Sequence, residues 1–82
     1  MNLNPIRQNM TELELENGTK ILFSYKTPVA ALVNESGTFH QYKTDKKLSR
    51  TTSKHISQWN QMGGAYGLQS QEYFDNLISE IK

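Results

Sequence analysis

The first regular pattern in the chain is an alternation of apolar and acidic side chains over residues 11–16. Leu13 and Leu15 fall on one face and glutamates fall on the other, which predicts a half-buried strand with a solvated glutamate face. An Asn-Gly pair follows, which is a strong signal for a β-hairpin. Residues 19–25 form the predicted return strand.

The register of this hairpin follows from the side chains that it places opposite one another. A two-residue loop at the Asn-Gly pair would put Ile21 on the glutamate face. A three-residue loop over 16–18 instead places Leu13 opposite Ile21 and Glu14 opposite Lys20. This register keeps the apolar residues together and pairs opposite charges. We therefore expect the longer loop, with its glycine in the left-handed conformation.

Two further strands complete a predicted four-stranded antiparallel meander. Residues 29–33 are a continuous apolar run, short enough for a buried strand. A cluster of turn residues at 34–37 separates this run from a fourth strand over 38–43. Residues 1–10 are polar, contain a proline and are expected to be a flexible lead-in. Residues 11–82 are then a single domain.

After residue 50 the spacing of the apolar residues changes from two to three or four. Ile56, Trp59 and Met62 recur at every third position, which predicts one face of a helix over residues 52–62. A glycine pair at 63–64 would end this helix. Three neighbouring residues are competent N-caps, namely Thr51, Thr52 and Ser53.

A second helix is predicted over residues 70–81, with Ser70 as its N-cap and residues 65–69 as the connector before it. Its apolar stripe consists of Tyr73, Phe74, Leu77, Ile78 and Ile81. The predicted fold class is therefore α+β, a four-stranded antiparallel meander followed by two C-terminal helices. Both helices are expected to pack on one face of the sheet, because that arrangement buries both apolar stripes.

Charge is concentrated in one segment, residues 43–55, which carries five cationic side chains against the single carboxylate of Asp45. The flanking segments are mildly acidic, and the formal net charge of the whole chain is +1. Cations, hydroxyl groups and a predicted helix N-terminus together favour an anion. The candidate binding residues are Lys43, Lys46, Lys47, Arg50, Thr52, Ser53, Lys54 and His55.

This basic segment has three interpretations. It is an ordinary charged loop before a capped helix, a contact for phosphate or nucleic acid, or a contact for an acidic protein surface. Tyr42, Trp59 and Tyr66 are candidate interface anchors where they are exposed. The helical spacing of Trp59 from Ile56 suits a core residue equally well.

Several classes of function find no support in the residues. Cysteine is absent, and the two histidines lie on different predicted elements, so we expect no metal site and no cofactor. Serine, histidine and aspartate form no catalytic motif, so we expect no enzymatic activity.

The same residues bear on compartment and assembly. No apolar run is long enough for a membrane span, and residues 1–8 lack the apolar core of a signal peptide. The lack of cysteine fits a reducing compartment such as the cytoplasm. Homo-oligomerisation stays open as a source of stability for so small a core.

Two segments together resemble a known group of proteins. Residues 23–30 read FSYKTPVA, and residues 51–56 read TTSKHI. Over residues 11–59 the chain is similar to small uncharacterised proteins of tailed bacteriophages and prophages, which share an FSY-x-TPVA hairpin and a TTS-(K/R)-HI segment. The resemblance implies a mobile element acting in a bacterial cytoplasm, and it implies no activity. It draws attention to Tyr25 and His55, and one interpretation of these residues is that they fix the fold, hydrogen-bonded across the turn at Pro28.

Two functions are consistent with these features. The first is a small non-enzymatic accessory protein of a phage or mobile element that binds nucleic acid or phosphate through residues 43–55. The alternative is a stoichiometric inhibitor of a host defence system, of the anti-CRISPR or another anti-defence type. Its partner would be an acidic or nucleic-acid-binding host protein.

Overall fold

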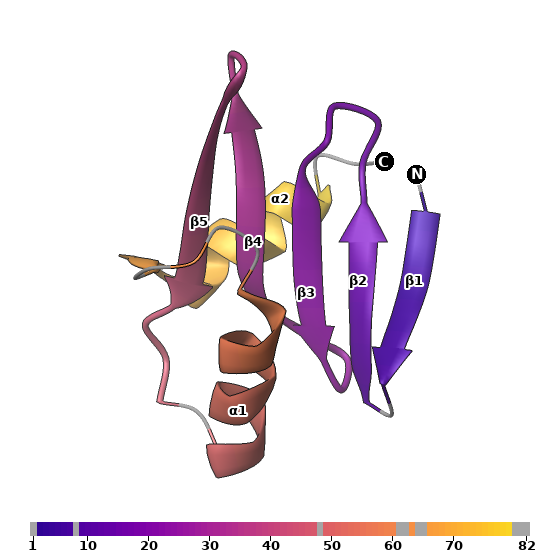
Figure 1. The fold of residues 1–82 in the computed structure, drawn as a ribbon. Helices are drawn as coiled ribbons and strands as arrows, with labels where there is room; N and C mark the ends of the chain where they lie inside the picture. Colours follow the sequence, from indigo (N-terminus) through magenta and orange to yellow (C-terminus); the bar gives the residue numbers. More distant parts are fainter. Residues whose placement is uncertain (1, 8, 48, 61–62, 64–65, 80–82) are drawn as a thin grey trace.

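The computed structural model describes residues 2–7, 9–47, 49–60, 63 and 66–79. Six strands form one sheet whose spatial order follows the sequence, and two helices pack against it (Figure 1). The elements in chain order are β1 (Asn2–Arg7), β2 (Met10–Glu14), β3 (Lys20–Ser24), β4 (Thr27–Glu35), β5 (Thr38–Thr44), α1 (Arg50–Trp59), β6 (Gly67–Gln69) and α2 (Gln71–Ser79).

The register predicted for the β2–β3 hairpin is confirmed. Leu13 lies opposite Ile21 and Glu14 lies opposite Lys20. The loop is the longer of the two considered, since the Leu15 amide donates to the Thr19 carbonyl at 2.8 Å. Gly18 has a φ of +91°, the left-handed conformation that this loop requires.

The prediction of four strands is wrong, because a strand is added at each end of the meander. Residues 2–7, expected to belong to a flexible lead-in, form β1, which places Leu3 opposite Leu13. The segment has no clear apolar alternation, because its apolar residues Leu3 and Ile6 are exposed and the register shifts between Pro5 and Arg7. An edge position also tolerates Pro5, which has no amide hydrogen to donate.

The second added strand is β6, in the segment expected to be a connector. It runs parallel to β5, so the chain must cross over between the two strands, and α1 lies in that crossover. Three residues are too few to show a hydrophobic period. A Cβ on Gly67 would lie 2.9 Å from the Tyr42 ring, so only glycine lets this strand approach β5 so closely.

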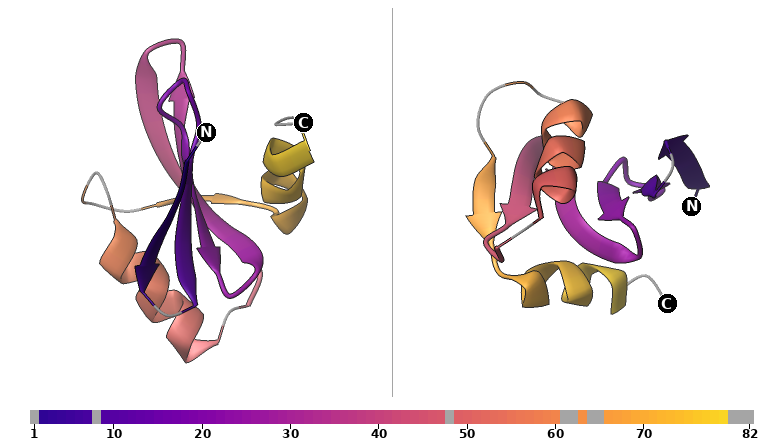
Figure 2. Two further views of the ribbon diagram at one scale, coloured as in Figure 1. Left: turned by 90° about the vertical axis from the view of Figure 1, so that its right-hand side faces the viewer. Right: turned by 90° about the horizontal axis from the view of Figure 1, so that it is seen from below.

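The two helices lie on opposite faces of the sheet, which corrects the expectation that both share one face (Figure 2). The reason is visible in β4, where Ala30 and Leu32 face α1 while Ala31 and Val33 face α2. A strand that is apolar at every position must be covered on both sides. The continuous apolar run therefore needs one helix on each face.

Each helix closes its own cluster of buried side chains. The cluster under α1 consists of Met10, Leu22, Val29, Ala30, Leu32, Ile56 and Trp59. The cluster under α2 consists of Leu13, Ile21, Ala31, Val33 and Phe74, with Tyr73, Leu77 and Ile78 packed against it. The predicted apolar stripe of the second helix is confirmed at Tyr73, Phe74, Leu77 and Ile78. Its fifth member, Ile81, lies outside the described residues.

The first helix begins and ends earlier than predicted. Its N-cap is Ser49, whose Oγ accepts a hydrogen bond from the Thr52 amide at 3.2 Å, so the three predicted caps lie inside the helix. It ends at Trp59, with Asn60 as its C-cap, before the glycine pair that was expected to stop it. Met62, placed on its stripe by the sequence, lies outside the described residues.

Candidate functional site

A cavity of about 330 Å³ lies between α1, the end of β5 and β6. We call it the basic groove. It is lined by Lys43, Thr44, Asp45, Lys46, Ser53, Ile56, Ser57, Tyr66 and Leu68. Four of these residues, Lys43, Lys46, Ser53 and Tyr66, were singled out from the sequence alone.

Strand register and helical spacing bring these side chains together. Lys43 lies opposite Ala30, which places it on the face of the sheet that carries α1. Leu68 lies beside Lys43 across the parallel β5–β6 pair. Ser53 and Ser57 are four residues apart on α1 and therefore share one side of the helix. Sequence reasoning missed Ser57 and Leu68, because the positions of α1 and β6 were not known.

Tyr66 forms a fixed part of the groove wall. Its hydroxyl donates to the Ile56 carbonyl at 2.8 Å, and its ring packs against the cluster under α1. Burial raises the pKa of Tyr66 to about 12. The phenol is therefore neutral at physiological pH and adds no charge to the groove.

The turn that follows β5 is held by hydrogen bonds that two of its backbone amides donate. The Asp45 amide donates to the Gln69 carbonyl at 2.8 Å, and the Lys46 amide donates to the Thr44 Oγ1 at 3.2 Å. Both side chains are exposed. The turn thus fixes where the Lys46 ammonium group and the Asp45 carboxylate leave the backbone at the rim of the groove.

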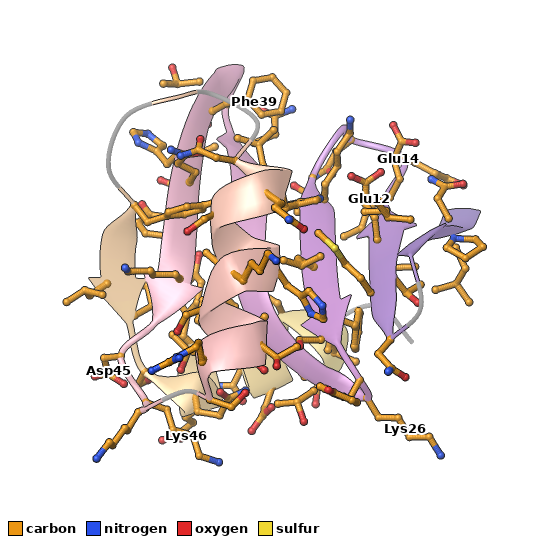
Figure 3. All side chains as sticks on the ribbon, turned by 60° about the horizontal axis from the view of Figure 1, so that its bottom comes forward. Glu12, Glu14, Lys26, Phe39, Asp45 and Lys46 are labelled. Carbon is orange, nitrogen blue, oxygen red and sulfur yellow. The ribbon has the colours of Figure 1, made fainter. Side chains whose placement is uncertain are left out.

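The glutamates of β2 and the turn after β5 lie on opposite sides of α1 (Figure 3). Asp45 and Lys46 lie near the start of the helix on one side, and Glu12 and Glu14 lie on the other. Glu12 does not stand on a purely solvated face as expected, because its Oε1 accepts a hydrogen bond from Trp59 Nε1 at 2.9 Å. The Glu12 carboxylate is thereby kept away from the groove.

The remaining predicted cations lie outside the cavity. Lys47 is on the loop before α1, and Arg50 and Lys54 are on the helix. All three side chains are exposed. They extend the basic surface from the groove toward the start of α1.

Thr52 and His55, also predicted to bind the ligand, face the protein interior instead. They are 8 % and 9 % exposed. Ser24 Oγ lies 3.0 Å from Thr52 Oγ1 and 3.0 Å from His55 Nδ1, and Ser49 Oγ donates to Thr52 Oγ1 at 3.1 Å. This network, which we call the serine–histidine anchor, ties α1 to the end of β3.

The hydrogen-bond partner of His55 is Ser24 rather than Tyr25, the partner considered in the sequence. Tyr25 is instead a ring neighbour of His55, with centroids 6.3 Å apart. Its backbone has a φ of +61°, and its amide donates to the Asn9 carbonyl. The Ser24–His55 pair has the atoms of a nucleophile and a base, but Ser24 is 2 % exposed, so a substrate has no access to its hydroxyl.

Of the three candidate aromatic anchors, Tyr66 alone lines the basic groove. Trp59 is 3 % exposed and belongs to the core. Tyr42 lies on the other face of the sheet, where its ring meets that of Tyr73 edge-on at 5.6 Å. Burial raises the pKa of Tyr42, and the nearby Glu35 carboxylate, which accepts its hydrogen bond, raises that pKa further.

Two features are absent from the part of the chain that the structure describes. No three histidine, aspartate or glutamate side chains gather there in a way that could hold a metal ion. No helix among those residues combines the length and the apolar character needed to cross a membrane.

The fold defines a small α+β domain, with a six-stranded mixed sheet between two short helices. The chain belongs to a family of unknown function (DUF8033), whose model matches residues 1–76. That match includes both core clusters, the serine–histidine anchor and the basic groove. Neither the curated proteins nor the solved structures contain a match to the chain.

Proposed function

We propose that this protein binds nucleic acid, or another phosphate-bearing ligand, through the basic groove and the cations next to it. It would act as a non-enzymatic accessory protein of a phage or mobile element, a setting that rests on the resemblance described above. The observation that carries the proposal is the cavity in which Lys43, Lys46 and Ser53 converge. Ammonium and hydroxyl groups are common partners of phosphate oxygens.

The arrangement of charge supports the proposal. The groove and the adjoining surface present five cations, and Asp45 is the single acidic residue in this segment. Trp59 holds Glu12 on the other side of α1. A polyanion can therefore approach from the β5 side without meeting the glutamates of β2 (Figure 3).

A salt titration tests the proposal. If Lys43, Lys46, Arg50 and Lys54 each contact one phosphate of duplex DNA, the logarithm of the binding constant should fall with the logarithm of salt concentration with a slope of about −3.6. Lys46→Ala should reduce the magnitude of the slope by about one. Fluorescence anisotropy with labelled DNA measures both quantities.

The matched control is Lys26→Ala. Lys26 is also exposed, but it lies in the β3–β4 turn, away from Lys46 (Figure 3). It should leave the slope unchanged. Absence of binding at low salt, or equal loss in the Lys26 and Lys46 variants, would reject the proposal.

A second candidate is the protein-binding inhibitor of host defence, and one observation favours it. A second cavity, of about 280 Å³, lies on β1, β2 and the β3–β4 turn, lined by Leu3, Thr11, Phe23, Tyr25 and Lys26. Leu3 and Tyr25 are 67 % and 53 % exposed. Exposed apolar and aromatic side chains around a hollow are typical anchors of a protein interface.

Salt dependence and the residues involved distinguish nucleic-acid binding from binding to a host protein. A protein complex should persist at a salt concentration that releases DNA, and Leu3→Asp should weaken it while Lys46→Ala affects mainly its rate of association. Size-exclusion chromatography with host lysate detects the complex of the wild-type protein, and the same experiment with each variant shows which substitution weakens it. A complex that Leu3→Asp leaves intact would argue against this surface as the interface.

A further inference from the structure

The lining of the basic groove is of two chemical kinds. One part is polar, with cations, hydroxyl groups and the Asp45 carboxylate at the rim. The other part is apolar, made of Ile56, Tyr66 and Leu68. Leu68 is 63 % exposed. A bare phosphate ion would use the first part and leave the second in water. A ligand that carries an apolar, flat group next to its phosphate would use both.

We infer that the groove holds one nucleotide unit, with its phosphate at Lys43 and Lys46 and its base against Tyr66 and Leu68. The preferred polymer is then single-stranded. This inference rests on the function proposed above and narrows it to one class of nucleic acid.

The size and shape of the groove support this choice. Its volume of about 330 Å³ is at the lower end of the range for small-molecule sites, about 300–1,000 Å³. A base within a duplex must be unpaired and unstacked before it can enter a hollow, which costs free energy. A base in a single strand is already free to turn out and stack on a side chain.

Two wall residues fit a nucleotide better than an inorganic anion. The Tyr66 ring is held in place by its hydrogen bond to the Ile56 carbonyl, so little conformational entropy is lost when a base packs on it. The Asp45 carboxylate at the rim repels a phosphate group, but it can accept a hydrogen bond from a ribose hydroxyl or a base amino group.

The experiment compares a labelled single strand with the duplex of the same sequence and length at one salt concentration. Wild-type protein should bind the single strand about tenfold more tightly. Leu68→Ser should lower the affinity for the single strand about fivefold, because it removes apolar surface that the base would cover. The same variant should leave the affinity for the duplex unchanged. Leu68 is exposed, so this substitution does not threaten the fold.

Two further variants make the result specific. Tyr66→Ala should show the same selective loss, with circular dichroism as the check that the protein is still folded. Lys54→Ala removes an exposed cation outside the cavity and should weaken both complexes to the same extent. Adenosine monophosphate and inorganic phosphate serve as competitors, and the nucleotide should displace the single strand at the lower concentration.

The outcomes distinguish this inference from the function on which it rests. If the duplex binds as tightly as the single strand, or if Leu68→Ser weakens both equally, the inference fails while nucleic-acid binding by the basic surface stands. If neither polymer binds at low salt, the proposed function fails as well.

Discussion

Ser24 Oγ and His55 Nδ1 lie 3.0 Å apart, and this contact joins two segments that are 31 residues apart in the sequence. Ser24 belongs to the FSYKTPVA segment, and His55 belongs to the TTSKHI segment. The two halves of the pattern that carries the phage resemblance therefore meet at one point in the interior. Their contact fixes α1 on the sheet, and α1 is the wall of the basic groove.

Removal of the central hydroxyl tests this role. Ser24→Ala would leave His55 Nδ1 and Thr52 Oγ1 buried without the partner that they share. We expect a loss of about 1–3 kcal/mol in the free energy of unfolding, measured by urea denaturation. Thr51→Ala, which changes an exposed hydroxyl on the same helix, should have little effect on that free energy. Equal stability of the two variants would contradict the anchor.

The position of the N-cap gives a second prediction. Ser49 and Ser53 are both exposed serines near the start of α1, but Ser49 Oγ accepts the Thr52 amide and Ser53 lines the groove. Ser49→Ala should therefore lower the free energy of unfolding by about 0.5–2 kcal/mol. Ser53→Ala should leave it nearly unchanged and should weaken ligand binding instead. Thermal denaturation measures the stability of both variants, and fluorescence anisotropy measures their ligand binding. A loss of stability in the Ser53 variant and not in the Ser49 variant would contradict the prediction.

The hydrophobic pattern alone predicted much of the fold. The β2–β3 register could be derived, because a shift of one residue would expose Ile21 and bury charge. The apolar face of α2 could be derived in the same way. In both cases one face of the element must be apolar, so the order of apolar and polar residues predicts which side chains are buried.

Other features depend on tertiary contacts that leave no periodic signal. β6 is three residues long, and β1 has a register shift after Pro5, so neither shows an apolar alternation. Lys43, Lys46 and Ser53 of the basic groove were predicted from charge and hydroxyl content, and Tyr66 as an aromatic anchor. Thr52 and His55, predicted in the same way as the first three, belong to the interior. Composition could not distinguish the groove-lining Ser53 from the buried Thr52 and His55, because the direction of each side chain on α1 depends on where the helix begins.

The core position of Phe74 is a third prediction. The ring is 0 % exposed and fills the cluster between α2 and the sheet. Phe74→Ala should cost about 3–5 kcal/mol of the free energy of unfolding, enough to unfold much of the population of so small a domain. Asn76→Ala, at an exposed position of the same helix, is the control. Circular dichroism at 25 °C distinguishes the two, and a fully folded Phe74 variant would contradict the packing.

The close approach of β6 to β5 gives a fourth prediction. A methyl group on Gly67 would meet the Tyr42 ring at 2.9 Å, and that ring already packs against Tyr73. Gly67→Ala should therefore cost about 1–3 kcal/mol. Because Leu68 follows directly, displacement of β6 should also weaken binding in the groove. In a Tyr42→Ala background the same glycine substitution should cost less than in the wild type, since the clash is then absent.

The ionisation of Tyr66 gives the last prediction. Burial raises its pKa from 10.0 to about 12 in the folded protein, so the folded state favours the neutral phenol. Between these two pH values the unfolded chain loses the proton while the folded protein keeps it. The free energy of unfolding should therefore be unaffected by this group below pH 10, and it should fall as the pH rises from 10 toward 12. Urea denaturation across this range measures the slope.

Tyr66→Phe removes the ionising group, so its slope should be shallower, although the lost hydrogen bond to Ile56 lowers stability at every pH. Tyrosinate absorbance provides an independent readout, since the component near pH 12 should be missing in the variant. Identical slopes and identical absorbance titrations in both proteins would show that Tyr66 is not held neutral in the wall of the groove.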